Sequence, residues 1–147
     1  MKKIFLLAIA ALLSASAAIA DDEKITDLEP KKLPPIAQNI IRAYFPETQI
    51  ILAQKKKSKV RHNFEVHLDN GTEIQFDKDG QWTLVDCGEL PIPQRMIPGK
   101  IQMFLNEKIH NPEVKKMFKD QKGYYNIILM TGQTLLFDNQ FRFIPSE

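Results

Sequence analysis

Cysteine is almost absent from this chain of 147 residues, in which Cys87 is the only one. A single cysteine excludes a disulfide within the chain, so its thiol is either free or linked to another chain. We expect a buried free thiol, because an unpaired cysteine commonly packs as a small apolar side chain. An enzyme that used Cys87 would instead require an exposed and reactive thiol.

Catalytic and metal-binding motifs are also missing. The sequence has no G-x-S-x-G, no H-E-x-x-H and no phosphate-binding loop, which are signatures of hydrolases, metallopeptidases and nucleotide-binding proteins. His62 and His67 are five residues apart on or beside one predicted strand, so they are expected on opposite faces and cannot chelate together. Residues 75–86 fit a calcium-binding loop only if Gln75 replaces its first ligand and Asp86 its bidentate glutamate. We therefore predict no enzymatic activity, no catalytic residue, no metal and no cofactor.

Long apolar runs are confined to the N-terminus, where Ile4–Leu13 follows two lysines and precedes the small-x-small pattern Ala18-Ile19-Ala20. This arrangement predicts a Sec-type signal peptide over residues 1–20, cleaved after Ala20. The run is shorter than the ~20 residues of a membrane-spanning helix, so no membrane insertion is expected after cleavage. We expect a soluble mature chain in the periplasm or secreted.

A net charge is lacking once the signal peptide is removed. Lys2 and Lys3 leave with it, and the remaining basic residues equal the 18 acidic ones. This balance gives no overall positive charge that would indicate binding to nucleic acid or to an anionic membrane. Residues 21–147 have the length of one domain or of two small halves.

Alternating side chains are the strongest structural signal in the sequence. Residues 64–76 alternate apolar and polar side chains around a two-residue turn at Asn70-Gly71, which predicts a β-hairpin. A second turn at residues 78–80 is expected to reverse the chain, so that Trp82 and Leu84 lie on the same apolar face. Another element must cover that face, since large apolar side chains are costly to leave in water.

A helix over residues 33–45 is predicted to provide this cover. Its apolar residues at positions 33, 36, 37, 40, 41, 44 and 45 have the spacing of one helical face, and Pro46 ends it. Residues 21–31 before it are charged and aperiodic, so we predict a flexible lead-in. A first strand at Gln49–Gln54 completes an α-β-β-β unit, and the lysine-rich segment Lys55–His62 is interpreted as a solvated loop or an anion-binding patch.

The same pattern returns in the second half of the chain. Apolar residues at positions 97, 101, 104, 105 and 109 predict a second helix between Pro98 and Pro112. Residues 125–129 then correspond to residues 64–68 at an offset of 61. We therefore predict an internal duplication, with one repeat over residues 32–89 and the other over residues 90–147.

These repeats resemble the PepSY-like family of exported bacterial proteins, described as β-lactamase-inhibitor-like. The resemblance implies an α+β fold of two tandem α-β-β-β repeats, whose strands form one curved antiparallel sheet with both helices packed on one face. It implies no enzymatic activity, and the family's names suggest protein binding or inhibition. The second repeat departs from the pattern at Asn139-Gln140, where an Asp-Gly turn is missing. The resemblance is carried by LP…II..YFP (33–46), FEVHLDNGTEIQFDKDGQW (64–82), IP..I..FL (97–105) and GYY…TG…LLFD (123–138).

If the helices cover the face that carries Phe64 and Tyr125, the opposite face carries the alternate residues, polar in the first repeat and more apolar in the second. An apolar cluster on an open sheet face suits a protein or peptide partner. Alternatively, the sheet curls and these residues pack against each other, the lead-in or a second copy. The candidate partner-binding residues are Glu65, His67, Glu73, Gln75, Thr83, Asn126, Ile128, Met130, Thr134, Leu136 and Arg142.

We therefore predict an exported, non-catalytic binding module of the cell envelope. Its partner is expected to be another exported protein or a peptide, and inhibition of that protein is one form that the binding could take. The alternative is a periplasmic carrier or sensor, which holds a small apolar ligand or a peptide strand between the sheet and the lead-in.

Overall fold

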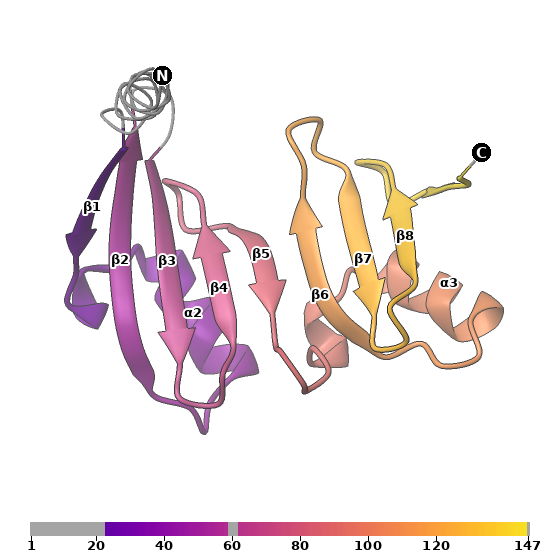
Figure 1. Cartoon of the computed structure of the whole chain (residues 1–147), viewed down its shortest axis with the longest axis horizontal. Coiled ribbons are helices and arrows are strands. Elements are labelled where there is room, and N and C mark those ends of the chain that lie inside the picture. Colours follow the sequence, from indigo (N-terminus) through magenta and orange to yellow (C-terminus); the bar gives the residue numbers. More distant parts are fainter. Residues whose placement is uncertain (1–22, 59–61, 147) are drawn as a thin grey trace, which may run out of the picture.

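The computed structural model of the chain describes residues 23–58 and 62–146, which form a nine-stranded antiparallel sheet and two α-helices. The strands are arranged in the sheet in their order in the sequence (Figure 1). Within these residues, no helix combines the length and the apolar character that crossing a membrane requires. The predicted signal peptide lies outside the described residues. The strands are β1 (Glu23–Asp27), β2 (Ile50–Ser58), β3 (His62–Leu68), β4 (Glu73–Phe76), β5 (Trp82–Asp86), β6 (Val114–Lys119), β7 (Tyr125–Leu129), β8 (Thr134–Phe137) and β9 (Phe143–Ile144).

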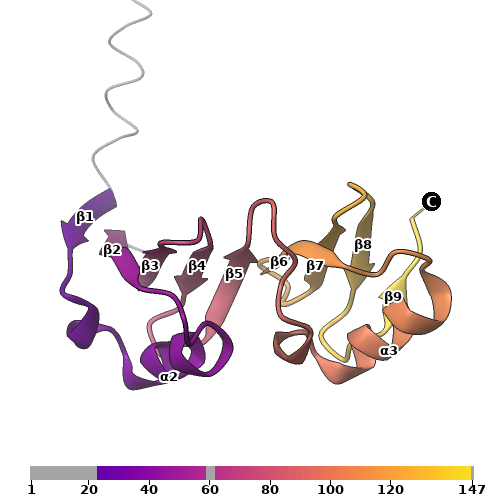
Figure 2. The same cartoon turned by 90° about the horizontal axis from the view of Figure 1, so that it is seen from below.

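The two helices begin in the same way. Pro34 precedes α2 (Pro35–Tyr44) and Pro98 precedes α3 (Gly99–Lys108). Proline suits this position because the first N–H groups of a helix have no partner within it. Short 3-10 turns, η2 (Pro30–Lys32) and η3 (Gln94–Met96), come before the helices. Figure 2 shows both helices on the same side of the sheet.

The hydrophobic core lies between the helices and the sheet. Helix α2 buries Ala37 and Ile41, and α3 buries Ile101 and Leu105. Burial of a large apolar side chain stabilises the fold by about 1.5–3 kcal/mol, so this layer holds the helices on the sheet. The most deeply buried strand residues are Val66, Leu68, Ile74, Phe76, Val85, Val114, Met117, Ile127, Leu129 and Phe137.

Two hairpins of the sheet share one register. In the β3–β4 hairpin Phe64 lies opposite Phe76, and in the β7–β8 hairpin Tyr125 lies opposite Phe137. Each residue of the second pair follows its counterpart in the first by 61 positions. Equivalent positions on the two hairpins therefore face the same side of the sheet, which allows their side chains to be compared one by one.

The turns after these hairpins are also alike. Oδ1 of Asp77 and Oδ1 of Asp138 each accept hydrogen bonds from the backbone N–H groups two and four residues later, at 2.9–3.0 Å. The fourth residue of each turn has a positive φ, +87° at Gly80 and +65° at Phe141. This conformation costs an L-residue such as phenylalanine about 1–2 kcal/mol. The last turn forms nevertheless, and the chain continues into β9 despite the missing Asp-Gly pair.

The predicted α-β-β-β unit is wrong in its number of strands, because four strands follow each helix. Strands β2 to β5 follow α2, and β6 to β9 follow α3. Strand β5 pairs with β4 on one side and with β6 on the other, so it joins the two hairpins into one sheet. Strand β9 is only two residues long and pairs with β8 at the edge.

The lead-in that was predicted to be flexible contains a strand, since β1 pairs antiparallel with β2. The side chains of Lys24–Asp27 are exposed, so the sequence has no apolar alternation that would predict β1. Backbone hydrogen bonds hold it by covering the edge of β2, which would otherwise present unpaired N–H and C=O groups. The predicted lysine-rich loop is also partly strand, because Lys55–Lys57 belong to β2; residues 59–61 lie outside the described residues.

The expectation that Trp82 and Leu84 share one face is wrong. Trp82 lies opposite Phe76, whereas Leu84 lies opposite Gln75. A β-bulge at Thr83 breaks the alternation between them, because it adds one residue that has no partner on the neighbouring strand. Trp82 therefore packs against the core, and Leu84 lies on the opposite face of the sheet.

Candidate binding face

The face of the sheet directed away from α2 and α3, which we term the open face, has no helix over it among the described residues (Figure 2). Cross-strand pairing arranges its side chains in two rows that cross most of the sheet. The first row is Gln54, Glu65, Gln75, Leu84, Phe118, Asn126 and Leu136, and the second is His67, Glu73, Asp86, Lys116, Ile128 and Thr134.

Five polar side chains of β2, β3 and β4 form what we term the Glu65 cluster: Lys56, Glu65, His67, Glu73 and Gln75. Glu65 is only 8% exposed. Its carboxylate forms an ion pair with Lys56 and lies 2.7 Å from Nε2 of His67. Gln75 donates a hydrogen bond from Nε2 to Oε1 of Glu73 at 3.1 Å. Such partners are necessary, because burial of a charge without them is very costly.

The ionisation of Glu65 depends on these neighbours. Burial by itself raises the pKa of Glu65, since it removes water from the carboxylate. The hydrogen bonds and charges of Lys56 and His67 outweigh burial, and the pKa of Glu65 lies below its ordinary value. Glu65 is therefore ionised at neutral pH, and its charge is held by the ammonium group of Lys56.

Glu65, His67 and Glu73 also offer three potential ligand atoms within 4.8 Å of one another. The sequence did not indicate this group, because its members come from two strands and only one of them is a histidine. Calcium takes about six to eight oxygen ligands, whereas one imidazole with two carboxylates is a donor set of transition metals. Lys56 already supplies positive charge to Glu65, so the geometry favours a salt-bridged cluster.

A groove with a volume of about 660 Å³ lies beside the Glu65 cluster. Leu84 of β5 and Phe118 of β6 line it and are direct neighbours across the two strands. Gln75 belongs to both the groove and the cluster, and Thr83 at the β-bulge also lines the groove. The groove therefore offers apolar surface at the centre of the open face, with polar groups along its sides.

Beyond the groove the open face becomes apolar, over what we term the apolar patch: Ile128, Met130 and Leu136. Ile128 and Leu136 are half-buried, and Met130 is 39% exposed. Equivalent positions of the two hairpins thus differ strongly in polarity. Asn126, Ile128, Thr134 and Leu136 in β7 and β8 stand where Glu65, His67, Glu73 and Gln75 stand in β3 and β4.

Most of the residues predicted from the sequence as binding candidates lie together on this face, and their role in binding stays a prediction. Met130 follows β7 directly, and its N–H donates to the carbonyl of Glu113 at 2.9 Å. Nε of Arg142 donates a hydrogen bond to Oδ2 of Asp138 at 2.8 Å. The other nine candidates belong to the Glu65 cluster (Glu65, His67, Glu73, Gln75), to the groove (Thr83) and to β7 and β8 (Asn126, Ile128, Thr134, Leu136).

Leu84 and Phe118 were missed, although both lie at the centre of the open face. Alternation fails at a β-bulge before each of them, at Thr83 in β5 and between Val114 and Lys116 in β6. One signal was present in the sequence. Val114 and Met117 are both apolar and three residues apart, a spacing that a regular strand does not place on one face.

Cys87 is a free thiol that is 2% exposed, which confirms the predicted buried cysteine. Burial raises the pKa of Cys87, and the negative charge of Asp86 raises it further. A buried thiol with a raised pKa is a poor nucleophile. The geometry therefore gives no support to an enzyme that uses Cys87.

Comparison with known families assigns the chain. The family model described as "Putative beta-lactamase-inhibitor-like, PepSY-like" matches residues 62–145. The chain belongs to the PepSY-like family. A search of curated proteins gave no match, and no catalytic family is indicated.

Three solved structures are similar to this PepSY-like protein. A "putative calcium-regulated periplasmic protein" from Bacteroides thetaiotaomicron is 29% identical, with a TM-score of 0.77 over 82% of this chain and 94% of that chain. A "putative periplasmic protein" from Bacteroides vulgatus is 29% identical, with a TM-score of 0.78 over 86% of this chain and 97% of that one. Another protein from Bacteroides vulgatus is 24% identical, with a TM-score of 0.75 over 85% of this chain and 99% of that one. This likeness supports the fold alone. The descriptions of these neighbours support a periplasmic location for this PepSY-like protein.

Proposed function

We propose that this protein is an exported, non-catalytic binding module whose open face docks a segment of another exported protein, and that docking inhibits that partner. The observation that carries this proposal is the open face itself. It passes from the Glu65 cluster, across the groove, to the apolar patch, and no helix of the described residues covers it. A face that combines partly exposed apolar groups with fixed polar groups suits a protein partner.

The size of the open face supports a protein partner over a small ligand. Nine strands at a spacing of about 4.8 Å make a sheet roughly 40 Å wide, and five-residue strands are roughly 17 Å long. The open face then offers on the order of 700 Å², which is close to the ~800 Å² that each partner contributes to a standard interface.

The charges on the face indicate the chemistry of the docked segment. Asp86 lies opposite Glu73 across β4 and β5, so the two carboxylates of the Glu65 cluster continue into a third. Lys56 and Lys116 are the nearby cations, and Lys119 and Asp120 of the groove balance each other, which leaves an excess of one negative charge. We expect the docked segment to carry a lysine or arginine beside apolar residues, because complementary charge sets the orientation of binding.

Affinity capture from a periplasmic extract tests the proposal. The bait proteins are the wild type, the double variant Ile128→Glu/Leu136→Glu, and Met103→Glu as the control. Met103 is 63% exposed on α3, so its substitution also replaces an apolar side chain with glutamate, once rather than twice, on the helix side of the molecule. Circular dichroism first establishes that all three baits are folded.

We expect one protein to be retained by the wild type and by Met103→Glu, and lost with the double variant. The purified partner should then bind the wild type at least 100-fold more tightly than the double variant, a difference of about 2.7 kcal/mol. The activity of the partner should fall as the wild type saturates it. Equal retention by the double variant would contradict docking on the open face.

We also infer that the chain is a tandem repeat over residues 32–89 and 90–147, with both helices packed on one face of the sheet. The shared hairpin register and the shared aspartate-anchored turns support this inference. We further propose export through a signal peptide over residues 1–20, cleaved after Ala20. Mass spectrometry of the protein purified from the periplasm should find Asp21 as the first residue.

A further inference from the structure

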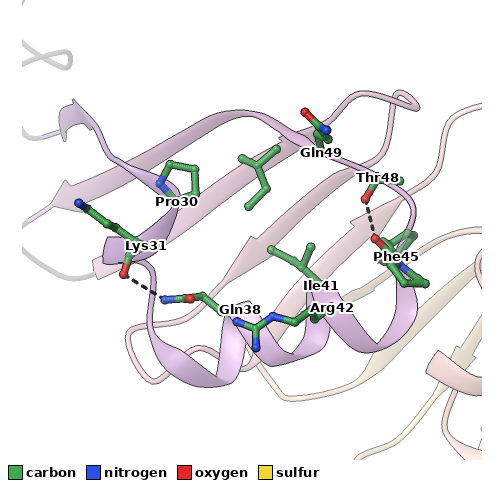
Figure 3. Close-up of a pocket in the computed structure, with 10 residues that line it drawn as sticks. Pro30, Lys31, Gln38, Ile41, Arg42, Phe45, Thr48 and Gln49 are labelled. Atoms are coloured by element: carbon green, nitrogen blue, oxygen red, sulfur yellow. Dashed lines mark hydrogen bonds between the residues drawn. The ribbon is translucent and has the colours of Figure 1, made fainter.

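A second cavity lies on the helix side of the molecule, where η2 passes α2 and the start of β2 (Figure 3). Its volume is about 460 Å³, which lies within the range of about 300–1,000 Å³ that is common for small-molecule sites. Ile50 faces this side because it lies opposite the buried Leu68. The cavity is therefore separated from the open face by the sheet itself.

The inner wall of this cavity is apolar and its shape is fixed. Ile41 and Phe45 are buried core residues that also line the cavity. The amide Nε2 of Gln38 donates hydrogen bonds to the carbonyls of Lys31 at 3.1 Å and Leu33 at 2.8 Å. These bonds tie η2 to α2, so the wall formed by the lead-in is held in place before any ligand binds.

Two cationic side chains, Lys31 and Arg42, stand at the rim of the cavity (Figure 3). Nζ of Lys31 lies 3.3 Å from Glu29, but both side chains are largely exposed, and such surface pairs contribute little. Within residues 23–58 and 62–146, Arg42 forms no ion pair. The guanidinium group of Arg42 is therefore available to an anion, directly beside apolar surface.

We propose that this cavity binds a small amphipathic monocarboxylate, which goes beyond the docking function of the open face. The carboxylate is held by Arg42, whose planar guanidinium matches it with two parallel hydrogen bonds, and Lys31 adds positive charge. The alkyl tail lies over Ile41, Phe45 and Ile50. Charge complementarity at the rim and burial of the tail at the wall together select a ligand with one anionic end.

Titration of the protein with octanoate, followed by amide chemical shifts in NMR spectra, tests this proposal. An eight-carbon acid held by one charged pair and one apolar wall should bind with a dissociation constant of about 1 mM. Octanol and octylamine have the same tail without the anion. Arg42→Gln removes the guanidinium, and Arg95→Gln, an exposed position on η3, is the matched control.

We expect saturable shifts at the amides of residues 41, 42 and 50 with octanoate, and binding about 10-fold weaker in Arg42→Gln, or about 1.4 kcal/mol. Arg95→Gln and the open-face variant Ile128→Glu/Leu136→Glu should bind octanoate as the wild type does, which separates this site from the open face. Octanol or octylamine that bound as tightly as octanoate would overturn the proposal. Amide shifts that occur only at residues outside the cavity would also overturn the proposal. So would amide shifts that do not saturate with the octanoate concentration.

Discussion

Replacement of Gly80 by alanine should measure how strongly α2 is docked on the turn between β4 and β5. Gly80 has a φ of +87°, and a Cβ added there would lie 2.9 Å from Cβ of Pro34 and 3.0 Å from the backbone nitrogen of Ala37. The positive φ costs alanine about 1–2 kcal/mol, and overpacking of this kind costs about 1–3 kcal/mol. We expect the free energy of unfolding to fall by about 2–5 kcal/mol in Gly80→Ala.

Gly71→Ala is the matched control for this prediction. Gly71 has the same φ of +87°, but no atom lies within 4 Å of its added Cβ. The control should lose only the backbone cost of about 1–2 kcal/mol. Urea unfolding followed by far-UV circular dichroism and by the fluorescence of Trp82 gives both free energies. Equal losses in the two variants would refute the reasoning, because the contact with α2 would then contribute nothing.

Three further predictions concern the last turn, the Glu65 cluster and the cysteine. Phe141→Gly should be more stable than Phe141→Ala by about 1 kcal/mol, because glycine accepts the φ of +65° without strain. Thermal unfolding measures both variants. A higher midpoint temperature for the alanine variant than for the glycine variant would disprove the strain. The pKa of Glu65 lies below its ordinary value of 4.5, so its ionised form stabilises the fold above that pH, and this contribution is lost as the pH falls through the folded pKa. Glu65→Gln should therefore lower the urea midpoint at neutral pH, and the gap to the wild type should close as the pH falls through the folded pKa of Glu65. A gap of constant size would argue against an ionised Glu65. Cys87 should react with iodoacetamide far more slowly in the folded protein than in urea, since burial raises the pKa of Cys87 and blocks access; rapid labelling of the folded protein would show that the thiol is accessible.

The helices and hairpins could be predicted because local pattern and tertiary burial agree there. The apolar spacing before Pro46 predicts α2, and Ala37 and Ile41 are indeed buried. Strand β1 could not be predicted, because its residues Lys24–Asp27 are exposed, and it is ordered by backbone pairing with β2 and by one side-chain hydrogen bond from Gln54 to Asp27. Side-chain patterns report burial, so an edge strand without buried side chains leaves no signal.

Part of the open face could be predicted from the sequence, because alternation assigns side chains to one face of a strand. Strict alternation placed Glu65 and Ile128 on the same face of the sheet, as the register shows. Leu84 lies on that face too, because the β-bulge at Thr83 shifts the alternation by one residue. Strict alternation therefore placed Leu84 on the wrong face. The ion pair between Lys56 and Glu65 joins two strands, and its register depends on the whole β2–β3 pairing. Periodicity assigns faces within a strand, but contacts between strands require the register.

Site-specific photo-crosslinking in living cells tests the open face most directly. A benzoyl-phenylalanine is introduced at position 118, in the groove, and in a second strain at position 103, on the exposed side of α3. If the open face docks another exported protein, position 118 should give one adduct of defined mass, and the Ile128→Glu/Leu136→Glu substitutions should abolish it. Position 103 should give none. An adduct from position 103 alone, or one from position 118 that survives the double substitution, would contradict the assignment of the open face as the docking surface.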